Sequence, residues 1–317
     1  RRALITHAVT KGLDPNVSMK DSGIEWIGEI PEHWEVKKLK FIFDVIKNGV
    51  WGSDPSENNS NLICVRVADF NRNNSTVSLE NRTLRNIPKN QEEKCLLENG
   101  DLLLERSGGG EKQPVGFTVI YNHDENAVCS NFITRLKPKD EFDSSFLNYI
   151  FSSMYYNTQN VKYIKQTTGI QNLDLEYLSQ SFFFPSYEEQ EQISEFLDKQ
   201  TTQFDELIAK SKAQVTLLEE KRQATITQAV TKGLDPSVPM KDSGVEWIGE
   251  TPEGWEVKRL KHVLENKPFA IVDGPFGTQL HSSEYVDDGI PLMNVNNIDK
   301  NGNFVFDNIK YISLEKF

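Results

Sequence analysis

A stretch of forty residues occurs twice in this chain, at residues 1–40 and again at residues 222–261. When the two copies are superposed with an offset of 221 residues, 31 of the 40 positions are identical. Solenoid repeats recur at roughly 20 to 50 residues, so this interval is far too long for one. Each period must therefore hold a whole domain with its connecting element. A duplicated domain implies two similar sites and a target with two halves.

Length and charge narrow the possible classes of protein. A chain of 317 residues suits about two domains, and its 37% hydrophobic content is enough for ordinary globular cores. The net charge of −12 argues against binding nucleic acid over the whole surface, but it leaves room for a local basic face or a basic partner. No apolar run approaches the roughly 18 residues that span a membrane, so we expect no membrane partner. The start at Arg1, inside a repeat, leads us to expect a segment of a longer or rearranged protein.

The cysteines bear on the compartment. Cys64, Cys95 and Cys129 lie far apart and form no CxxC pair. An odd number of scattered thiols favours a reducing cytoplasm, without a disulfide framework or a zinc site.

The predicted fold class is α+β. Short apolar runs bounded by Gly, Pro and Asn predict strands at residues 63–67, 101–105, 115–121 and 132–136, and residues 146–156 predict a helix. Residues 1–11 have a helical pattern that ends at Gly12. The tryptophans of the duplicated segment, Trp26, Trp34, Trp247 and Trp255, indicate a packed collar at the entry to each domain, with stacking on DNA as the alternative.

Residues 186–231 predict one long helix. Ser186, with Glu189 three residues later, matches a capping box. About 45 residues at 1.5 Å each give a rod of roughly 65–70 Å, too long to bury its apolar stripe on one small domain. We therefore expect a coiled coil with a second long helix, which a second copy of the chain could supply. The alternative is a helical hairpin broken near residues 200–202. The predicted coiled-coil seam consists of Ile193, Leu197, Phe204, Leu207, Leu218 and Ile226.

Catalytic motifs are weak. The run from Gly108 to Lys112 lacks the Ser or Thr of a nucleotide-binding loop, and the five histidines have no metal-ligand spacing. Asp21, followed by Glu35 and Lys37, imitates the D…ExK pattern of metal-dependent nucleases and recurs in the second copy. Because ExK is a frequent tripeptide, we treat a nuclease as a minor alternative.

Several short motifs occur in a characteristic order along the chain. They lie at Thr167–Leu173, Phe184–Ile193, Asp205–Ile208, Leu218–Arg222, Ala229–Gly233 and Asp273–Gly277. With this order, the duplication and the long helix, the chain resembles the specificity subunit of type I restriction-modification enzymes. The resemblance covers essentially the whole chain.

The resemblance implies an architecture. Residues 1–15 would be the tail of a preceding long helix, 16–185 a complete target recognition domain, 186–233 a spacer helix, and 234–317 the start of a second recognition domain. Each recognition domain would read one half of a split double-stranded DNA target. The long helices would set the spacing and dock methyltransferase subunits.

The resemblance also implies a non-catalytic chain without a cofactor. S-adenosylmethionine, ATP and Mg would belong to partner subunits, with the restriction subunits joining through the complex. The remaining alternative is a coiled-coil assembly scaffold that does not read DNA.

Charge and residue type select candidate DNA contacts. Residues 41–185 carry 14 Lys and Arg against 18 Asp and Glu, whereas residues 186–221 carry 4 against 9. The long helix therefore suits protein docking better than DNA. In the domains, basic, amide and aromatic residues beside glycine-rich and threonine-rich segments are the candidates, with a solvated loop as the alternative for each. These residues are Trp51, Arg66, Arg72, Arg106, Lys112, Lys162, Lys165, Gln166, Thr167, Thr168, Gln171, Phe276 and Asn294.

The two domain copies differ in their polar residues. Residues 65–70 correspond to residues 293–298, which keep the apolar frame but place Asn294 where the first copy has Arg66. Arginine pairs with the O6/N7 edge of guanine and asparagine with the N6/N7 edge of adenine. We predict that this position reads a base and that the two half-sites differ there. The alternative is an ion pair between Arg66 and Asp69.

Overall fold

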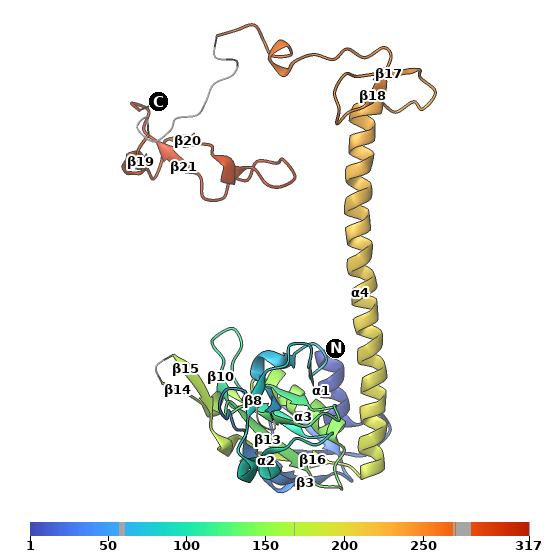
Figure 1. Cartoon of the computed structure of the whole chain (residues 1–317), viewed down its shortest axis with the longest axis vertical. Coiled ribbons are helices and arrows are strands. Elements are labelled where there is room, and N and C mark those ends of the chain that lie inside the picture. Colours follow the sequence, from blue (N-terminus) through green and yellow to red (C-terminus); the bar gives the residue numbers. More distant parts are fainter. Residues whose placement is uncertain (57–60, 168, 269, 271–279, 317) are drawn as a thin grey trace. The chain divides into compact units, whose positions relative to one another are not determined.

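A computed structural model describes residues 1–56, 61–167, 169–268, 270 and 280–316. The chain divides into two compact units, Arg1–Glu219 and Glu220–Phe317, and each is described by itself (Figure 1). Unit 1 is a mixed α+β domain, as the sequence predicts.

Unit 1 begins with a helix and a hairpin. Helix α1 (Arg2–Lys11) ends as predicted at Gly12, whose φ of 72° is a conformation that glycine adopts without strain. The buried face of α1 contains Ile5, Ala8 and Val9, which belong to the main core of the unit. The antiparallel hairpin of β1 (Met19–Asp21) and β2 (Glu29–Pro31) follows.

A six-stranded sheet forms the centre of unit 1. Its strand order is β4-β13-β9-β11-β7-β6, and β9 has antiparallel neighbours on both sides. All four residues of β9 are buried, which agrees with the almost unbroken apolar run in its sequence. The strands span Phe43–Asn48 (β4), Ile133–Pro138 (β13), Leu102–Glu105 (β9), Thr118–Ile120 (β11), Thr76–Val77 (β7) and Phe70–Asn71 (β6).

Smaller sheets surround this centre. β12 (Ala127–Cys129), β5 (Asn61–Val65) and β8 (Leu84–Asn86) form one, and β10 (Ser107–Gly108), β15 (Ile170–Leu173) and β14 (Ile164–Thr167) form another. β3 (Glu35–Lys38) pairs with β16 (Ser181–Phe184), which ties the two ends of the domain together. Two helices complete it, α2 (Lys89–Cys95) and α3 (Ser144–Tyr156), and the N-cap Asp143 of α3 accepts the Phe146 N–H at 2.7 Å.

The predicted elements are present, with shifted boundaries. A strand occurs within or beside each of the four predicted runs, and α3 covers the predicted helix. The run predicted at residues 63–67 ends as a strand at Val65, because the Asp69 carboxylate accepts the Arg66 backbone N–H and starts the 3-10 turn Val67–Asp69. In the run at residues 115–121 only Thr118–Ile120 is a strand.

Helix α4 (Tyr187–Lys232) is continuous over 46 residues, so the prediction of a single rod is confirmed and the hairpin alternative is wrong. At its start the Ser186 hydroxyl accepts the Glu189 N–H at 3.3 Å. The predicted capping box is incomplete, because the Glu189 carboxylate has other partners. It accepts the Trp34 indole N–H at 3.1 Å and pairs with His33 at 2.8 Å, which anchors α4 to the collar.

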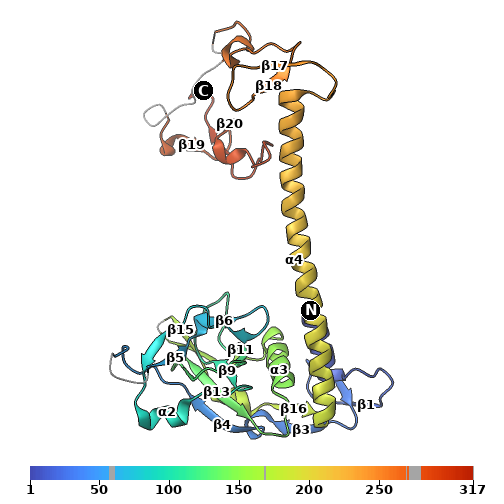
Figure 2. The same cartoon turned by 45° about the vertical axis from the view of Figure 1, so that its right-hand side comes forward.

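The predicted seam falls into two parts. Ile193 and Leu197 are fully buried in the core of unit 1, so their partners are the domain's own residues rather than a second long helix. Phe204, Leu207 and Leu218 are exposed, at 36%, 61% and 56%. Helix α1 lies beside the first part of α4 in Figure 1, and in Figure 2 the N-terminus overlies the same part of α4. Arg1 pairs with Asp205 of α4 at 2.7 Å.

Unit 2 repeats the entry hairpin. β17 (Met240–Asp242) pairs with β18 (Glu250–Pro252) in the register of β1 and β2, shifted by 221 residues. A three-stranded sheet follows, ordered β19 (Tyr285–Val286), β21 (Lys310–Ile312) and β20 (Ile290–Leu292). The collar prediction holds for Trp34, which is 2% exposed, but Trp247 is 78% exposed in unit 2.

Candidate nucleic-acid interface

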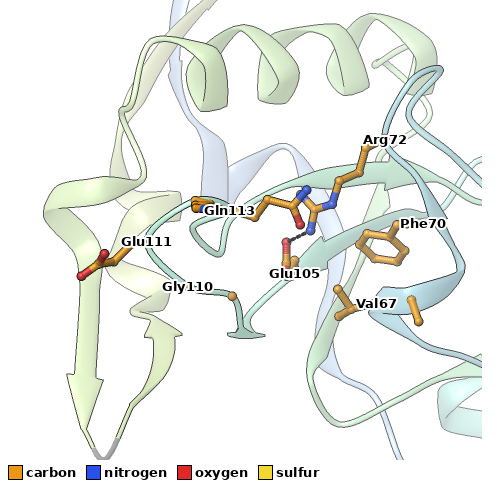
Figure 3. Close-up of a pocket in the computed structure, with 10 residues that line it drawn as sticks. Val67, Phe70, Arg72, Glu105, Gly110, Glu111 and Gln113 are labelled. Atoms are coloured by element: carbon orange, nitrogen blue, oxygen red, sulfur yellow. Dashed lines mark hydrogen bonds and ion pairs between the residues drawn. The ribbon is translucent and has the colours of Figure 1, made fainter. Parts of the chain in front are cut away.

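A pocket of about 990 Å³ lies in unit 1 between two segments far apart in sequence (Figure 3). One wall comes from the 3-10 turn and strand β6, with Val67 and Phe70. The other comes from Glu105, at the end of β9, and the loop 109–113 that follows β10. Of the predicted DNA-contact residues, Arg72 and Lys112 line this pocket.

The side chain of Arg72 is fixed at the edge of the pocket. Its guanidinium group donates to the Glu105 carboxylate at 2.6 Å and lies over the Phe117 ring, 4.7 Å from the ring centroid. The Glu105 side chain is 2% exposed and that of Arg72 is 24% exposed. Burial raises the pKa of Glu105, and the charge of Arg72 opposes that shift. The ion pair therefore holds the arginine in one place, with part of its surface still open.

Arg66 lies just before the pocket wall, one residue after the observed end of strand β5, although the predicted strand included it. Its guanidinium donates to both oxygens of Asp69, at 2.9 and 3.3 Å, and the same carboxylate accepts the Arg66 backbone N–H. The hydrogen bond that the guanidinium donates to the Asp69 carboxylate raises the pKa of Arg66. The ion pair that was the alternative to base reading is thus present, and the Arg66 side chain remains 36% exposed.

Unit 2 builds the same turn with different residues. Asn294 precedes the 3-10 turn Val295–Asn297, and its backbone N–H donates to the Asn297 side chain at 3.2 Å. The Asn294 side-chain oxygen accepts the Asn296 N–H at 3.0 Å. Arg66 and Asn294 therefore occupy equivalent N-cap positions, as the comparison of the two copies predicts. Phe276, the other candidate in this unit, lies outside the described residues.

The hairpin of β14 and β15 and the 3-10 turn Val161–Tyr163 before it carry several more of the predicted residues. Lys165 pairs with Asp174 at 2.6 Å, and Lys162 lies over the Tyr163 ring. Gln166 is exposed and faces Gln171 across the hairpin, but Gln171 is buried and accepts the Val115 N–H at 3.3 Å. Gln171 is therefore a structural residue here. Thr167 is the last residue of β14, and Thr168 lies outside the described residues.

Arg106 and Trp51, the remaining candidates in unit 1, make different contacts. The Arg106 backbone N–H donates to Phe132 O, and its carbonyl accepts the Leu173 N–H, at 2.8 Å each. Trp51 is 39% exposed, and the guanidinium of Arg85 lies over its ring, 4.5 Å from the centroid. Arg85 also donates to the Trp51 carbonyl at 3.0 Å, so this tryptophan is held against β8.

Sequence reasoning missed Glu105 and Gln113. Glu105 is the one charged residue that ends the apolar run 102–104, and a charge at the end of a buried strand is the signal that could have identified it. Gln113 lies in the loop after the glycine run and carries no comparable signal.

Metal chemistry has little support among the residues that the structure describes. They include no group of three or more His, Cys, Asp or Glu side chains placed to hold a metal ion. Glu35 and Lys37 of the nuclease-like pattern pair with one another on β3 at 3.7 Å. Within the same described ranges, none of the helices is both long and apolar enough to cross a membrane.

The architecture of unit 1 is that of a mixed α+β domain attached to a long helix. Residues 31–217 match the family described as the type I restriction modification DNA specificity domain, and the chain belongs to this family. The resemblance inferred from the sequence motifs is confirmed.

Relatives of this chain include two proteins of Methanocaldococcus jannaschii. It is 28% identical to the putative type I restriction enzyme MjaX specificity subunit, over 84% of this chain and 60% of that protein. It is 25% identical to the type I restriction enzyme MjaVIII specificity subunit, over 85% and 56%. The chain thus spans somewhat more than half the length of these relatives.

Among solved structures, a chain from a study of type I R-M complex assembly is 18% identical, with a TM-score of 0.49. The match covers 74% of this chain and 53% of that one.

Proposed function

We propose that this chain is the sequence-specific DNA-recognition part of a type I restriction-modification complex and is not itself catalytic. The observation that carries the proposal is the family match over residues 31–217. The matched residues include the pocket and the β14–β15 hairpin of unit 1. The two relatives are also named as specificity subunits of type I restriction enzymes.

The proposal gives the two units parallel roles. Unit 1 reads one half of a split target, and the equivalent turn at Asn294 belongs to a second reader. The chain would then begin with the tail of a helix (residues 1–15) and a complete reader (16–185). A spacer helix (186–233) and the start of the second reader (234–317) would follow. Arg66 and Asn294 would distinguish guanine from adenine at one position of each half-site.

The remaining part of α4 serves assembly in this proposal. Its first residues are anchored in unit 1, whereas the stripe from Phe204 to Leu218 offers apolar side chains at helical spacing. Methyltransferase subunits or a second long helix would cover this stripe. S-adenosylmethionine, ATP and Mg would be held by partner subunits, and restriction subunits would join through them.

Binding to DNA with and without methyltransferase subunits tests the proposal. We expect weak binding by the acidic chain alone and tight, sequence-dependent binding by the complex. A complex that assembles through α4 but binds all DNA sequences equally would favour the assembly-scaffold alternative. Mg-dependent cutting by the isolated chain would instead support the nuclease alternative.

A further inference from the structure

We infer that Arg72, held in place by Glu105, reads a guanine of the DNA target in the pocket of unit 1. The inference rests on the proposed function and assigns one base contact within it. The Arg72 side chain already has a fixed geometry in the folded chain.

The ion pair between Glu105 and Arg72 does more to orient the Arg72 guanidinium than to stabilise the fold. A carboxylate buried at the end of the central strand β9 loses its hydration, and an apolar pair of similar size is often as stable as a buried ion pair. What Glu105 and the Phe117 ring do provide is a single orientation for the guanidinium plane. Glu105 is therefore a positioning residue that acts through Arg72.

The donor geometry matches one base edge. The bond to Glu105 uses one of the five N–H donors of the guanidinium group, and donors remain for a second partner. Figure 3 shows Arg72 and Gln113 directed toward one another across the pocket, with Phe70 and Val67 on the wall beside them. A guanidinium fork fits the paired O6 and N7 acceptors of guanine, and apolar walls suit the face or edge of a base.

Charge argues against a phosphate in this position. Arg72 and Lys112 line the pocket, but so do Glu105 and Glu111, so its formal charges cancel. A phosphate needs net positive charge, whereas the neutral acceptors of a base do not suffer from the nearby carboxylate. The favoured ligand is therefore a guanine edge, and a backbone phosphate is the competing result in the test.

The first experiment uses the unaltered chain assembled with its methyltransferase subunits. Its affinity is measured for target duplexes in which single guanines are replaced by 7-deazaguanine, which lacks N7, or by inosine, which keeps O6 and N7. We expect the guanine read by Arg72, which is separate from any guanine read by Arg66, to lose about 5- to 150-fold in affinity with 7-deazaguanine and little with inosine. Equal affinity for every 7-deazaguanine duplex would overturn the inference.

The second experiment compares the methylated motif for Arg72→Lys and Glu105→Gln with that of the unaltered complex. Both variants should accept other bases at that guanine position. The loss of specificity should be smaller for Glu105→Gln, because glutamine keeps one oxygen acceptor for the Arg72 guanidinium. Arg82→Lys is the matched control, because Arg82 also pairs with a glutamate, Glu125, at 2.9 Å but lies outside the pocket.

The outcomes separate the inference from the function on which it rests. An unchanged motif for Arg72→Lys, or methylation that weakens equally at all sequences, would reject guanine reading and, in the second case, indicate a phosphate contact. Absence of any motif with the unaltered chain would reject the proposed function itself, and the role of Arg72 with it.

Discussion

Buried charge at Glu105 is the residue-scale feature with the clearest consequence for stability. Burial raises the pKa of this carboxyl above its ordinary value of 4.5, so the folded chain holds the proton more tightly than the unfolded chain. The contribution of Glu105 to stability is therefore full below pH 4.5 and is lost as the pH rises through the folded pKa.

Glu105→Gln should remove this dependence. The free energy of unfolding of the unaltered chain, minus that of the variant, should decrease as the pH rises from about 4 to 8. Urea unfolding of both proteins across this range measures the difference. A difference that grows with pH would mean that attraction to Arg72 outweighs desolvation in the folded chain.

Arg66 gives a second prediction at this scale. Arg66→Ala should cost about 1–3 kcal/mol of binding and relax one position of the methylated motif, if the guanidinium held by Asp69 reads a base. Methylome sequencing of cells carrying the variant measures this. If the variant keeps the full motif and the same extent of methylation, Arg66 has only a structural role in the ion pair with Asp69.

At the scale of elements, α4 combines two surfaces. Its start is anchored by Ile193, Leu197 and the Glu189 contact with Trp34, whereas Leu207 and Leu218 are exposed. A contiguous exposed apolar patch is a common mark of an interaction site. The helix is thus part of unit 1 at one end and available to a partner beyond it.

Leu207→Asp and Leu218→Asp should weaken assembly. A carboxylate buried without a partner costs several kcal/mol in the complex, whereas in the chain alone these positions are exposed and tolerate it. Ala213→Asp is the control, because Ala213 is exposed and lies on the opposite face of α4. Light scattering after gel filtration, with and without methyltransferase subunits, reports assembly. Equal assembly of all three variants would show that the apolar stripe of α4 is not the assembly surface.

The elements that local patterns specify could be predicted from the sequence. The length of α4 follows from its apolar periodicity and its N-cap, and the main strands follow from short apolar runs between turn residues. The contacts that shape the site could not be predicted, because they join residues far apart in the chain. Arg72 meets Glu105 across 33 positions, and Glu189 turns from its expected cap to Trp34 across 155.

Candidate DNA contacts were predicted from residue type, and type alone does not show which side chains already have partners. Gln171 was selected because amides contact bases, yet its oxygen accepts the Val115 N–H in the interior. Lys165 is similar, because Asp174 pairs with it. Arg72 was selected for its charge, and only the folded sheet shows the carboxylate that orients it.

At the scale of the molecule, the negative charge must be reconciled with DNA binding. The chain carries a net charge of −12, so any DNA contact relies on local basic residues and, in the proposed complex, on partner subunits. The two equivalent turns at Arg66 and Asn294 fit a protein that reads two different half-sites on one scaffold.

Binding by the assembled complex should fall steeply with salt. Each neutralised phosphate releases counterions, so six to ten phosphate contacts would lower affinity by about 10³- to 10⁵-fold between roughly 50 and 200 mM salt. Fluorescence anisotropy over a salt series measures the slope. Tight binding by the isolated chain that does not change with salt would contradict this view of an acidic reader dependent on its partners.

Methylome sequencing tests the central claim, that this chain selects the DNA sequence for a methyltransferase. Cells would express the methyltransferase subunits alone, with the chain, or with the Arg72→Lys chain. We predict a defined methylated motif that requires the chain and that changes at one guanine position with the variant. Methylation of the same motif without the chain, or no motif with it, would contradict the account.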